Sequence, residues 1–111
     1  NLNALGAKVD VISVIGDCKT SDELKELLKE INISSKYLIP QKGRVTSKKS
    51  RIISANQQVI RFDRENTDDI NGNSEESVLE NFKSIVVEYD VVLLSDYGKG
   101  LFTFKLTQYW P

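Results

Sequence analysis

The chain has 111 residues, enough for at most one modest domain, and 15 basic and 16 acidic side chains leave a net charge of −1. This balance lacks the basic excess that usually accompanies nucleic-acid binding. The absence of histidine excludes Ser-His-Asp catalysis, a histidine general base and ordinary zinc sites. A single cysteine, Cys18, excludes an internal disulfide and favours an intracellular setting. No apolar run of about 18 residues indicates a membrane span, and the first residues do not resemble a signal peptide.

The first predicted unit is a strand followed by a helix. Residues 8–15, KVDVISVI, are apolar and rich in β-branched side chains, which is typical of a strand buried on both faces of a parallel sheet. Gly16 ends this strand, and Thr20 or Ser21 is the predicted cap of a helix. The helix continues to Ile31, because its apolar residues recur at spacings of three and four and form one face.

The middle of the chain predicts an antiparallel hairpin. Residues 37–39 are short and extended and end at Pro40. Residues 45–55 and 58–63 have the composition of strands, and Asn56-Gln57 between them is the predicted turn.

The last third repeats the alternation of helix and strand. Ser74 or Asn73 is the predicted cap of a helix over residues 75–89, whose apolar side chains again lie on one face. Residues 90–95, DVVLLS, are strongly apolar and predict a second buried strand.

The order of elements predicts an α/β fold with a mostly parallel sheet, an antiparallel hairpin at one side and flanking helices. A further helix is expected from Leu101, breaking off at Trp110-Pro111. Ligands of such folds bind beyond the carboxyl ends of the strands, which here are Gly16-Asp17 and residues 95–99.

The turn DYGKG after the second apolar strand is a candidate phosphate or metal-phosphate site. Glycine lets the backbone approach a ligand, Lys99 supplies a compact positive charge, and Asp96 can hold Mg²⁺ or accept from a sugar hydroxyl. The alternative is an ordinary turn in which Asp96 caps and Lys99 is solvated. The turn is not a Walker A loop, because the required spacing of glycine and lysine is absent.

The predicted hairpin carries an unusual number of charged side chains. By the alternation of a strand, Lys49 and Arg51 share one face while Lys48 points the other way. Arginine suits bidentate contact with phosphate, and lysine acts as a point charge. A solvated sheet face with cross-strand ion pairs is the alternative. The residues concerned are the basic stripe of Arg44, Lys48, Lys49 and Arg51, and Arg61, Asp63 and Glu65 on the second strand.

Five motifs, NLNALGA, VIGD, TSKKSRII, NQQVIRFDRE and LLSDYGKG, occur in this order within residues 1–108. Together they resemble the D-glycero-β-D-manno-heptose 7-phosphate kinases, a group of ribokinase-like sugar kinases. In many bacteria such a kinase is the N-terminal half of a bifunctional ADP-heptose synthase.

The resemblance implies transfer of the γ-phosphoryl group of ATP, with Mg²⁺, to the anomeric hydroxyl of heptose 7-phosphate. It places the protein in the cytoplasm, in ADP-heptose synthesis for the lipopolysaccharide core. Its implied partners are a sugar phosphate and ATP, with no nucleic acid and no membrane. The implied substrate-binding residues are Arg51 first, then Lys49, Lys48, Asn56, Gln57, Arg61 and Asp63, and the implied phosphate and Mg²⁺ region is Asp96 and Lys99.

Several features of the family are absent from this chain. The glycines of its GGAAN segment would precede Asn1, and its GAGD motif, which carries the catalytic base and the anion hole, would lie downstream. Cys18 and Ser21 replace residues common in the family, which weakens a role for their loop. We therefore expect residues 1–111 to be a single fragment of a kinase domain, with no catalytic residue and no metal ligand set of its own. We expect it to be inactive alone and to be marginally stable or to form a homodimer through exposed sheet edges.

Two other functions stay open. The protein could be a ribokinase-like kinase for another phosphorylated sugar, or a non-catalytic α/β binding or oligomerisation module. Flanking GGAAN and GAGD motifs in the native gene would favour a kinase.

Overall fold

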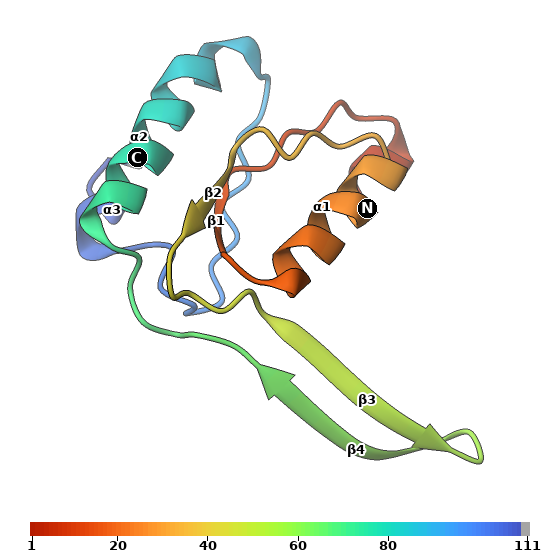
Figure 1. Cartoon of the computed structure of the whole chain (residues 1–111). Helices are drawn as coiled ribbons and strands as arrows, with labels where there is room; N and C mark the ends of the chain where they lie inside the picture. Colours follow the sequence, from red (N-terminus) through yellow and green to blue (C-terminus); the bar gives the residue numbers. More distant parts are fainter. Residues whose placement is uncertain (110–111) are drawn as a thin grey trace.

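Two small sheets and their flanking helices make up the computed structural model, which describes residues 1–109. β1 pairs with β2 in parallel, and β3 pairs with β4 in an antiparallel hairpin that projects from the rest of the molecule (Figure 1). This confirms the predicted α/β class. The elements are η1 (Asn3–Leu5), β1 (Ser13–Gly16), α1 (Lys19–Glu30), β2 (Leu38–Gln41), β3 (Lys48–Ser54), β4 (Gln57–Arg64), α2 (Gly72–Ile85), η2 (Val86–Glu88) and α3 (Phe104–Thr107).

The first strand is shorter than predicted, because its ladder with β2 begins only at Ser13. α1 begins at Lys19, and its N-cap is Cys18 without a side-chain hydrogen bond, so the predicted caps Thr20 and Ser21 are wrong. Ser21 lies inside the helix and is buried.

The Ser21 hydroxyl has another role. It donates to the carbonyl oxygen of Gly16 at 2.6 Å and lies 2.7 Å from the hydroxyl oxygen of Thr46. The Thr46 hydroxyl also accepts from the Gly16 amide at 2.7 Å. These bonds join the end of β1, the first turn of α1 and the segment before the hairpin.

The hairpin turn lies one residue earlier than predicted. Ala55 and Asn56 have φ angles of 48° and 61°, and Gln57 already pairs with Ser54 in the ladder. Positive φ at both central residues is what a tight two-residue hairpin of this handedness requires. Asn tolerates this conformation well, whereas Ala does so only with strain.

The second helix begins earlier than predicted. α2 starts at Gly72, and its cap is Asn71, whose side-chain oxygen accepts from the Ser74 amide at 2.9 Å, so the predicted caps Asn73 and Ser74 are wrong. Val78 of α2 packs with Ile70 and with Leu106 of α3 in the buried core. The partly buried side chains packed against this core are Ile12, Val14, Ile39, Leu79 and Leu101.

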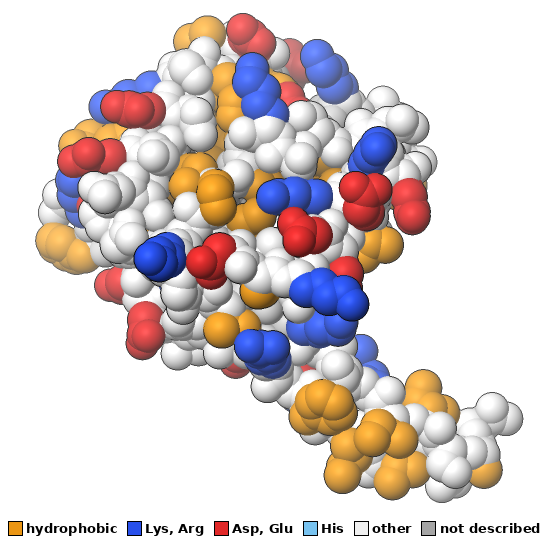
Figure 2. All heavy atoms as spheres, viewed as in Figure 1, with side chains coloured by type: hydrophobic (Ala, Val, Ile, Leu, Met, Phe, Trp, Pro, Cys, Tyr) orange, Lys and Arg blue, Asp and Glu red, His pale blue; other side chains and the backbone are white. Residues whose placement is uncertain are grey.

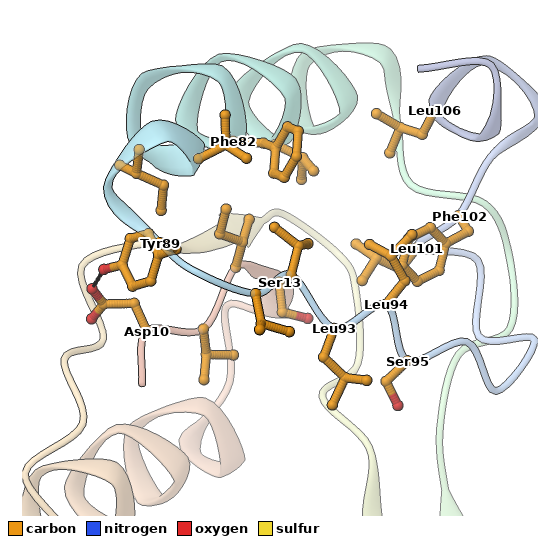
Figure 3. Close-up of a pocket in the computed structure, with 17 residues that line it drawn as sticks. Asp10, Ser13, Phe82, Tyr89, Leu93, Leu94, Ser95, Leu101, Phe102 and Leu106 are labelled. Carbon is orange, nitrogen blue, oxygen red and sulfur yellow. Dashed lines mark hydrogen bonds between the residues drawn. The ribbon is translucent and has the colours of Figure 1, made fainter. Parts of the chain in front are cut away.

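The predicted strand over residues 90–95 does not form. These residues carry no strand assignment, and residues 91–95 together with residues 10–13 line a cavity of about 380 Å³ beneath α2 (Figure 3). Val91 and Leu93 are 79% and 71% exposed. Apolar, β-branched composition favours a strand, but a strand also needs a hydrogen-bonded ladder, and this segment has none among residues 1–109.

A helix does follow Leu101, as predicted. Thr103 caps α3, and its hydroxyl oxygen accepts from the Leu106 amide at 3.2 Å. The predicted break at Trp110-Pro111 lies outside the described residues. Within residues 1–109, no helix combines the length and the apolar character needed to cross a membrane.

Candidate functional site

A cavity of about 270 Å³ lies where the hairpin joins the body of the molecule. We call it the base pocket. It is lined by the first three residues of β1, by both segments that connect the hairpin and by the turn after residue 94. Its polar lining residues include Ser13, Arg44, Thr46, Ser47, Asn66, Ser95, Asp96 and Lys99. The cavity therefore lies against β1, but neither Gly16 nor Asp17, the predicted ligand-binding end of that strand, lines it.

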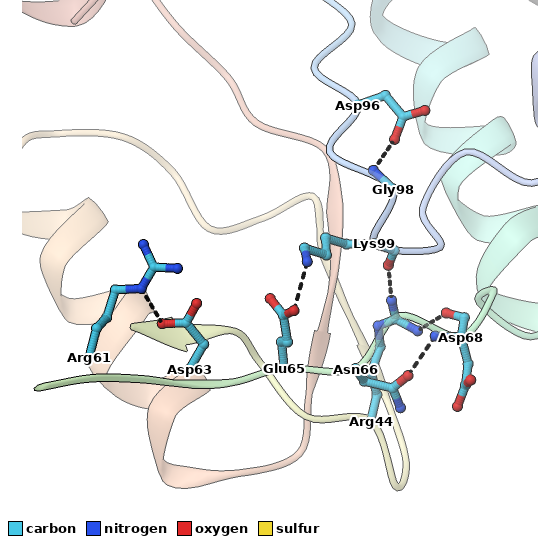
Figure 4. A network of polar contacts seen from close by, with 9 residues as sticks. All are labelled: Arg44, Arg61, Asp63, Glu65, Asn66, Asp68, Asp96, Gly98 and Lys99. Atoms are coloured by element: carbon cyan, nitrogen blue, oxygen red, sulfur yellow. Dashed lines mark hydrogen bonds and ion pairs between the residues drawn. The ribbon is translucent and has the colours of Figure 1, made fainter. Parts of the chain in front are cut away.

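Asp96 and Lys99 both line the base pocket, so the structure brings these two predicted residues together. One carboxylate oxygen of Asp96 accepts from the Gly98 amide at 2.8 Å and shapes the turn (Figure 4). The Lys99 ammonium donates to the Glu65 carboxylate at 2.7 Å. Glu65 thus links the turn to the segment that leaves the hairpin.

Arg44 departs most from its predicted place. Sequence spacing grouped it with an exposed basic stripe, but it is buried, with 7% of its surface exposed. Its Nη1 donates to the carbonyl oxygen of Asp68 at 2.9 Å and its Nη2 to that of Lys99 at 2.5 Å (Figure 4). These partners lie 24 and 55 positions further along the chain, a separation that no local pattern in the sequence encodes.

The charged residues of the hairpin divide between its faces as predicted. Lys49 lies opposite Asp63 and Arg51 opposite Arg61, so these four share one face. Arg61 also lies 3.6 Å from the Asp63 carboxylate on the same strand. Lys48 points the other way.

The other face of the hairpin is apolar at its centre. Ile52 lies opposite Ile60, and Phe62 follows on the same face; the three are 52%, 54% and 57% exposed. In Figure 2 hydrophobic side chains gather on the hairpin and cationic side chains gather where it meets the body. At that junction the Lys48 ammonium donates to the Glu23 carboxylate of α1 at 2.8 Å.

The structure does not bring the whole predicted site into one cavity. Asn56 lies in the turn at the tip of the hairpin, and Gln57 is the first residue of β4 (Figure 1). None of the predicted hairpin residues from Lys48 to Asp63 lines the base pocket, whereas Ser47 and Asn66, just outside the strands, do.

Cys18 lies beside the base pocket at the start of α1. A hydrogen bond from the Thr46 backbone, followed by one from the Ser21 hydroxyl, lowers the pKa of the Cys18 thiol to about 6. Its sulfur lies 3.6 Å from the Ser21 hydroxyl oxygen. The thiol is therefore largely ionised at neutral pH.

The lining of the base pocket supplies one carboxylate, that of Asp96, toward a magnesium ion. Among residues 1–109, no group of three or more His, Cys, Asp or Glu side chains could hold a metal ion by itself. Mg²⁺ commonly binds through one or two carboxylates, waters and substrate phosphates. Asp96, at the rim of the base pocket, is a carboxylate of that kind.

Comparison with known proteins gives two findings. Residues 1–107 match the family described as pfkB family carbohydrate kinase. The chain is also similar to proteins named bifunctional protein HldE: it is 52% identical over 108 residues to that of Aliarcobacter butzleri, 46% to that of Sulfurimonas denitrificans and, over 109 residues, 38% to that of Helicobacter hepaticus. These matches cover 97–98% of the chain and 23% of each relative, so the chain spans about a quarter of the length of the relatives.

Proposed function

Because the chain belongs to the pfkB family of carbohydrate kinases, we propose that it is part of an ATP-dependent kinase that phosphorylates heptose 7-phosphate at its anomeric hydroxyl. Family membership confirms the sugar-kinase resemblance found in the motifs. The similarity to HldE proteins supports a place in the heptose pathway. We propose that this place is ADP-heptose synthesis for the lipopolysaccharide core, in the cytoplasm.

The observation that carries this proposal is the pair of arginines on the hairpin. Arg51 and Arg61 lie directly opposite each other, and like charges in that arrangement destabilise a hairpin. Lys49 adds a third cation to the same face. A phosphate bound on this face would neutralise these charges, and the planar guanidinium group suits its oxygens.

The other proposed roles follow from position. Asp63 orients Arg61 through the ion pair on β4. Lys48 lies on the opposite face and pairs with Glu23 of α1, so we propose that it anchors the hairpin to the body and does not belong to the cationic face. Asn56 and Gln57 offer amide groups to sugar hydroxyls at the far end of the hairpin. At the base pocket, Lys99 would neutralise transferred charge and Asp96 would hold Mg²⁺ through its carboxylate. When bound, ATP supplies the phosphoryl group; we assign no catalytic base within this chain and expect the chain alone to be inactive.

Calorimetry and kinetics test the proposal. We expect the full-length protein to consume ATP with heptose 7-phosphate, and we expect Arg51→Ala to weaken sugar-phosphate binding by roughly 10- to 100-fold, because a charge-assisted hydrogen bond is lost. Arg64→Ala is the matched control. Arg64 pairs with Lys48 on the opposite face of the same hairpin, so its loss should change binding by less than about twofold.

Two outcomes would overturn the proposal. One is a full-length protein that does not turn over heptose 7-phosphate; fructose 6-phosphate, assayed in parallel, reports whether another phosphorylated sugar is the substrate. The other is an equal effect of Arg51→Ala and Arg64→Ala, which would mean that the cationic face does not hold the phosphate.

A second candidate is an oligomerisation module, which the exposed apolar face of the hairpin favours. The hairpin forms a sheet of only two strands, so each strand also has an unpaired edge. We propose that two copies of the isolated chain associate through their hairpins.

A further inference from the structure

Arg44 is a buried cation, and within residues 1–109 its guanidinium group donates hydrogen bonds to two backbone carbonyls. Among residues 1–109 it forms no ion pair with a carboxylate, although it is 7% exposed. Removing a charge from water is unfavourable, and two carbonyl oxygens compensate for it less well than a carboxylate does. If the site needed only to be filled, an apolar side chain of similar volume would serve as well.

The two carbonyls that Arg44 holds belong to different functional segments. Asp68 follows the hairpin, and Lys99 belongs to the turn that carries Asp96. A planar guanidinium group donates to the two carbonyls from two separate nitrogens held at a fixed spacing, whereas lysine and a neutral amide donate from a single nitrogen. Arg44 therefore fixes the distance between the segment after the hairpin and the turn.

The rest of this junction is close-packed backbone. The Ile70 amide donates to the Gly100 carbonyl oxygen at 2.9 Å. A Cβ atom on Gly100 would lie 1.9 Å from the Asp68 carbonyl oxygen, so only glycine allows this approach. The backbone of Arg44 is fixed in the same way, because a Cβ atom on Gly16 would lie 2.1 Å from its carbonyl oxygen. The end of β1, the segment after the hairpin and the turn thus meet at Arg44.

We propose that Arg44 is a positioning residue for phosphoryl transfer: its guanidinium group sets the place of the Asp96–Gly100 turn relative to the hairpin. This inference rests on the proposed kinase function. Arg44 acts through the turn and does not bind the sugar phosphate. Its removal should therefore lower kcat, since small displacements of positioned groups cost rate, and should leave KM for the sugar phosphate nearly unchanged.

Steady-state kinetics of the full-length protein test the inference. We expect Arg44→Ala and Arg44→Lys to lower kcat by roughly 10- to 100-fold, with KM for heptose 7-phosphate within about threefold. Lysine should not rescue, because its single nitrogen does not reproduce the fixed spacing of the two guanidinium nitrogens that hold the carbonyls. Val78→Ala is the control for lost stability: Val78 is a core residue of α2, so this change should lower the melting temperature without lowering kcat at a temperature at which all variants are folded.

Hydrogen exchange supplies a readout that does not depend on activity. The Ile70 amide reports the junction directly, because its acceptor is Gly100. In folded Arg44→Ala, or in Arg44→Lys if the alanine variant does not fold, this amide should exchange at least about tenfold faster. The amide of Val78 should keep its wild-type rate.

The outcomes separate the possibilities. If the wild-type protein has no kinase activity, the proposed function is wrong, and so is the proposed part of Arg44 in catalysis. The hydrogen-exchange rate of the Ile70 amide would still decide whether Arg44 fixes the turn. Full kcat in Arg44→Lys, or unchanged exchange at Ile70, would overturn the inference. A rise in KM with unchanged kcat would also overturn it, since Arg44 would then contact the substrate.

Discussion

Gly98 and Gly100 have similar backbones but different surroundings. Both have positive φ angles, 63° and 74°, in the turn that carries Asp96 and Lys99. No atom lies within 4 Å of the Cβ position of Gly98, whereas the Asp68 carbonyl would overlap a Cβ on Gly100. The pair therefore separates the cost of the backbone conformation from the cost of lost close packing.

We predict that Gly98→Ala destabilises the chain by about 1 kcal/mol, which is the strain of a left-handed alanine. Gly100→Ala should cost more than about 3 kcal/mol, because the backbone must also move apart. Urea unfolding of both variants measures the difference. Equal losses would mean that the contact between Gly100 and Asp68 is looser than the structure shows.

Glu75 links α2 to α3, and its surroundings predict that the stability of the fold depends on pH. It is buried, accepts from the Thr103 hydroxyl and lies 3.1 Å from the Lys105 ammonium. The Thr103 hydrogen bond, and then Lys105, hold the pKa of Glu75 below its ordinary value of 4.5, although burial opposes them. Because the folded pKa is the lower one, Glu75 contributes stability above pH 4.5 that is lost as the pH falls through the folded value.

We expect Glu75→Gln to lose about 1 kcal/mol of stability at neutral pH and to show a flatter decline below pH 4.5 than the wild type. Glu80→Gln, an exposed position on the same helix, should keep the wild-type slope. Urea midpoints measured from neutral to acidic pH check this. Parallel curves for wild type and Glu75→Gln would exclude Glu75 as the source of the dependence.

At the scale of elements, the hairpin is stabilised mainly by its own ladder, and its turn is strained. Every residue of β4 is exposed, as are most residues of β3, so packing on the body contributes little. Ala55 has a φ of 48°, which glycine adopts without strain. The turn is therefore the point at which a single substitution can strengthen the element.

Ala55→Gly should stabilise the hairpin by about 1 kcal/mol and slow amide exchange in β3 and β4 roughly fivefold. Amides of α2 should be unaffected, since α2 does not contact the turn. Ser54→Gly is the control: this position has an ordinary strand conformation, so glycine there should speed exchange. Slower exchange in both variants would show that the strain does not lie at Ala55.

The elements that the sequence predicts are those whose signal is local. The apolar spacing of α1 and α2 and the composition of β3 and β4 predict their type, with ends displaced by a few residues. The turn is displaced because alanine is not expected at positive φ. The predicted strand over residues 90–95 is wrong because strand formation depends on a distant partner strand. The contacts of Arg44 with Asp68 and Lys99 also depend on residues far away in the sequence, so the sequence pattern does not predict them.

At the scale of the whole molecule, the projecting hairpin makes the chain extended. The radius of gyration is 15.6 Å, against about 13 Å for a compact domain of this length. The hairpin also carries the apolar face of Ile52, Ile60 and Phe62, which lies largely in solvent. Exposed apolar surface of this kind is typical of an interaction site.

We predict that the isolated chain self-associates and that Phe62→Lys weakens its association by about tenfold or more. Ile53→Lys is the matched control, because Ile53 is also an exposed apolar residue of the hairpin, at 66%, but points to the opposite face. Sedimentation velocity over a range of concentrations measures both. A monomer at every concentration, or equal effects of the two variants, would contradict the prediction.

The large sequence separation between Arg44 and its hydrogen-bond acceptors has a consequence for synthesis of the protein. One of its acceptors, the carbonyl of Lys99, lies 55 positions later in the chain. At about 5–20 residues per second, translation needs roughly 2–7 seconds to proceed from Arg64, the last residue of β4, to Lys99, whereas a hairpin forms within about 10 microseconds. The hairpin is therefore complete on the nascent chain long before the base pocket can close, and its apolar face is exposed to chaperones during that interval.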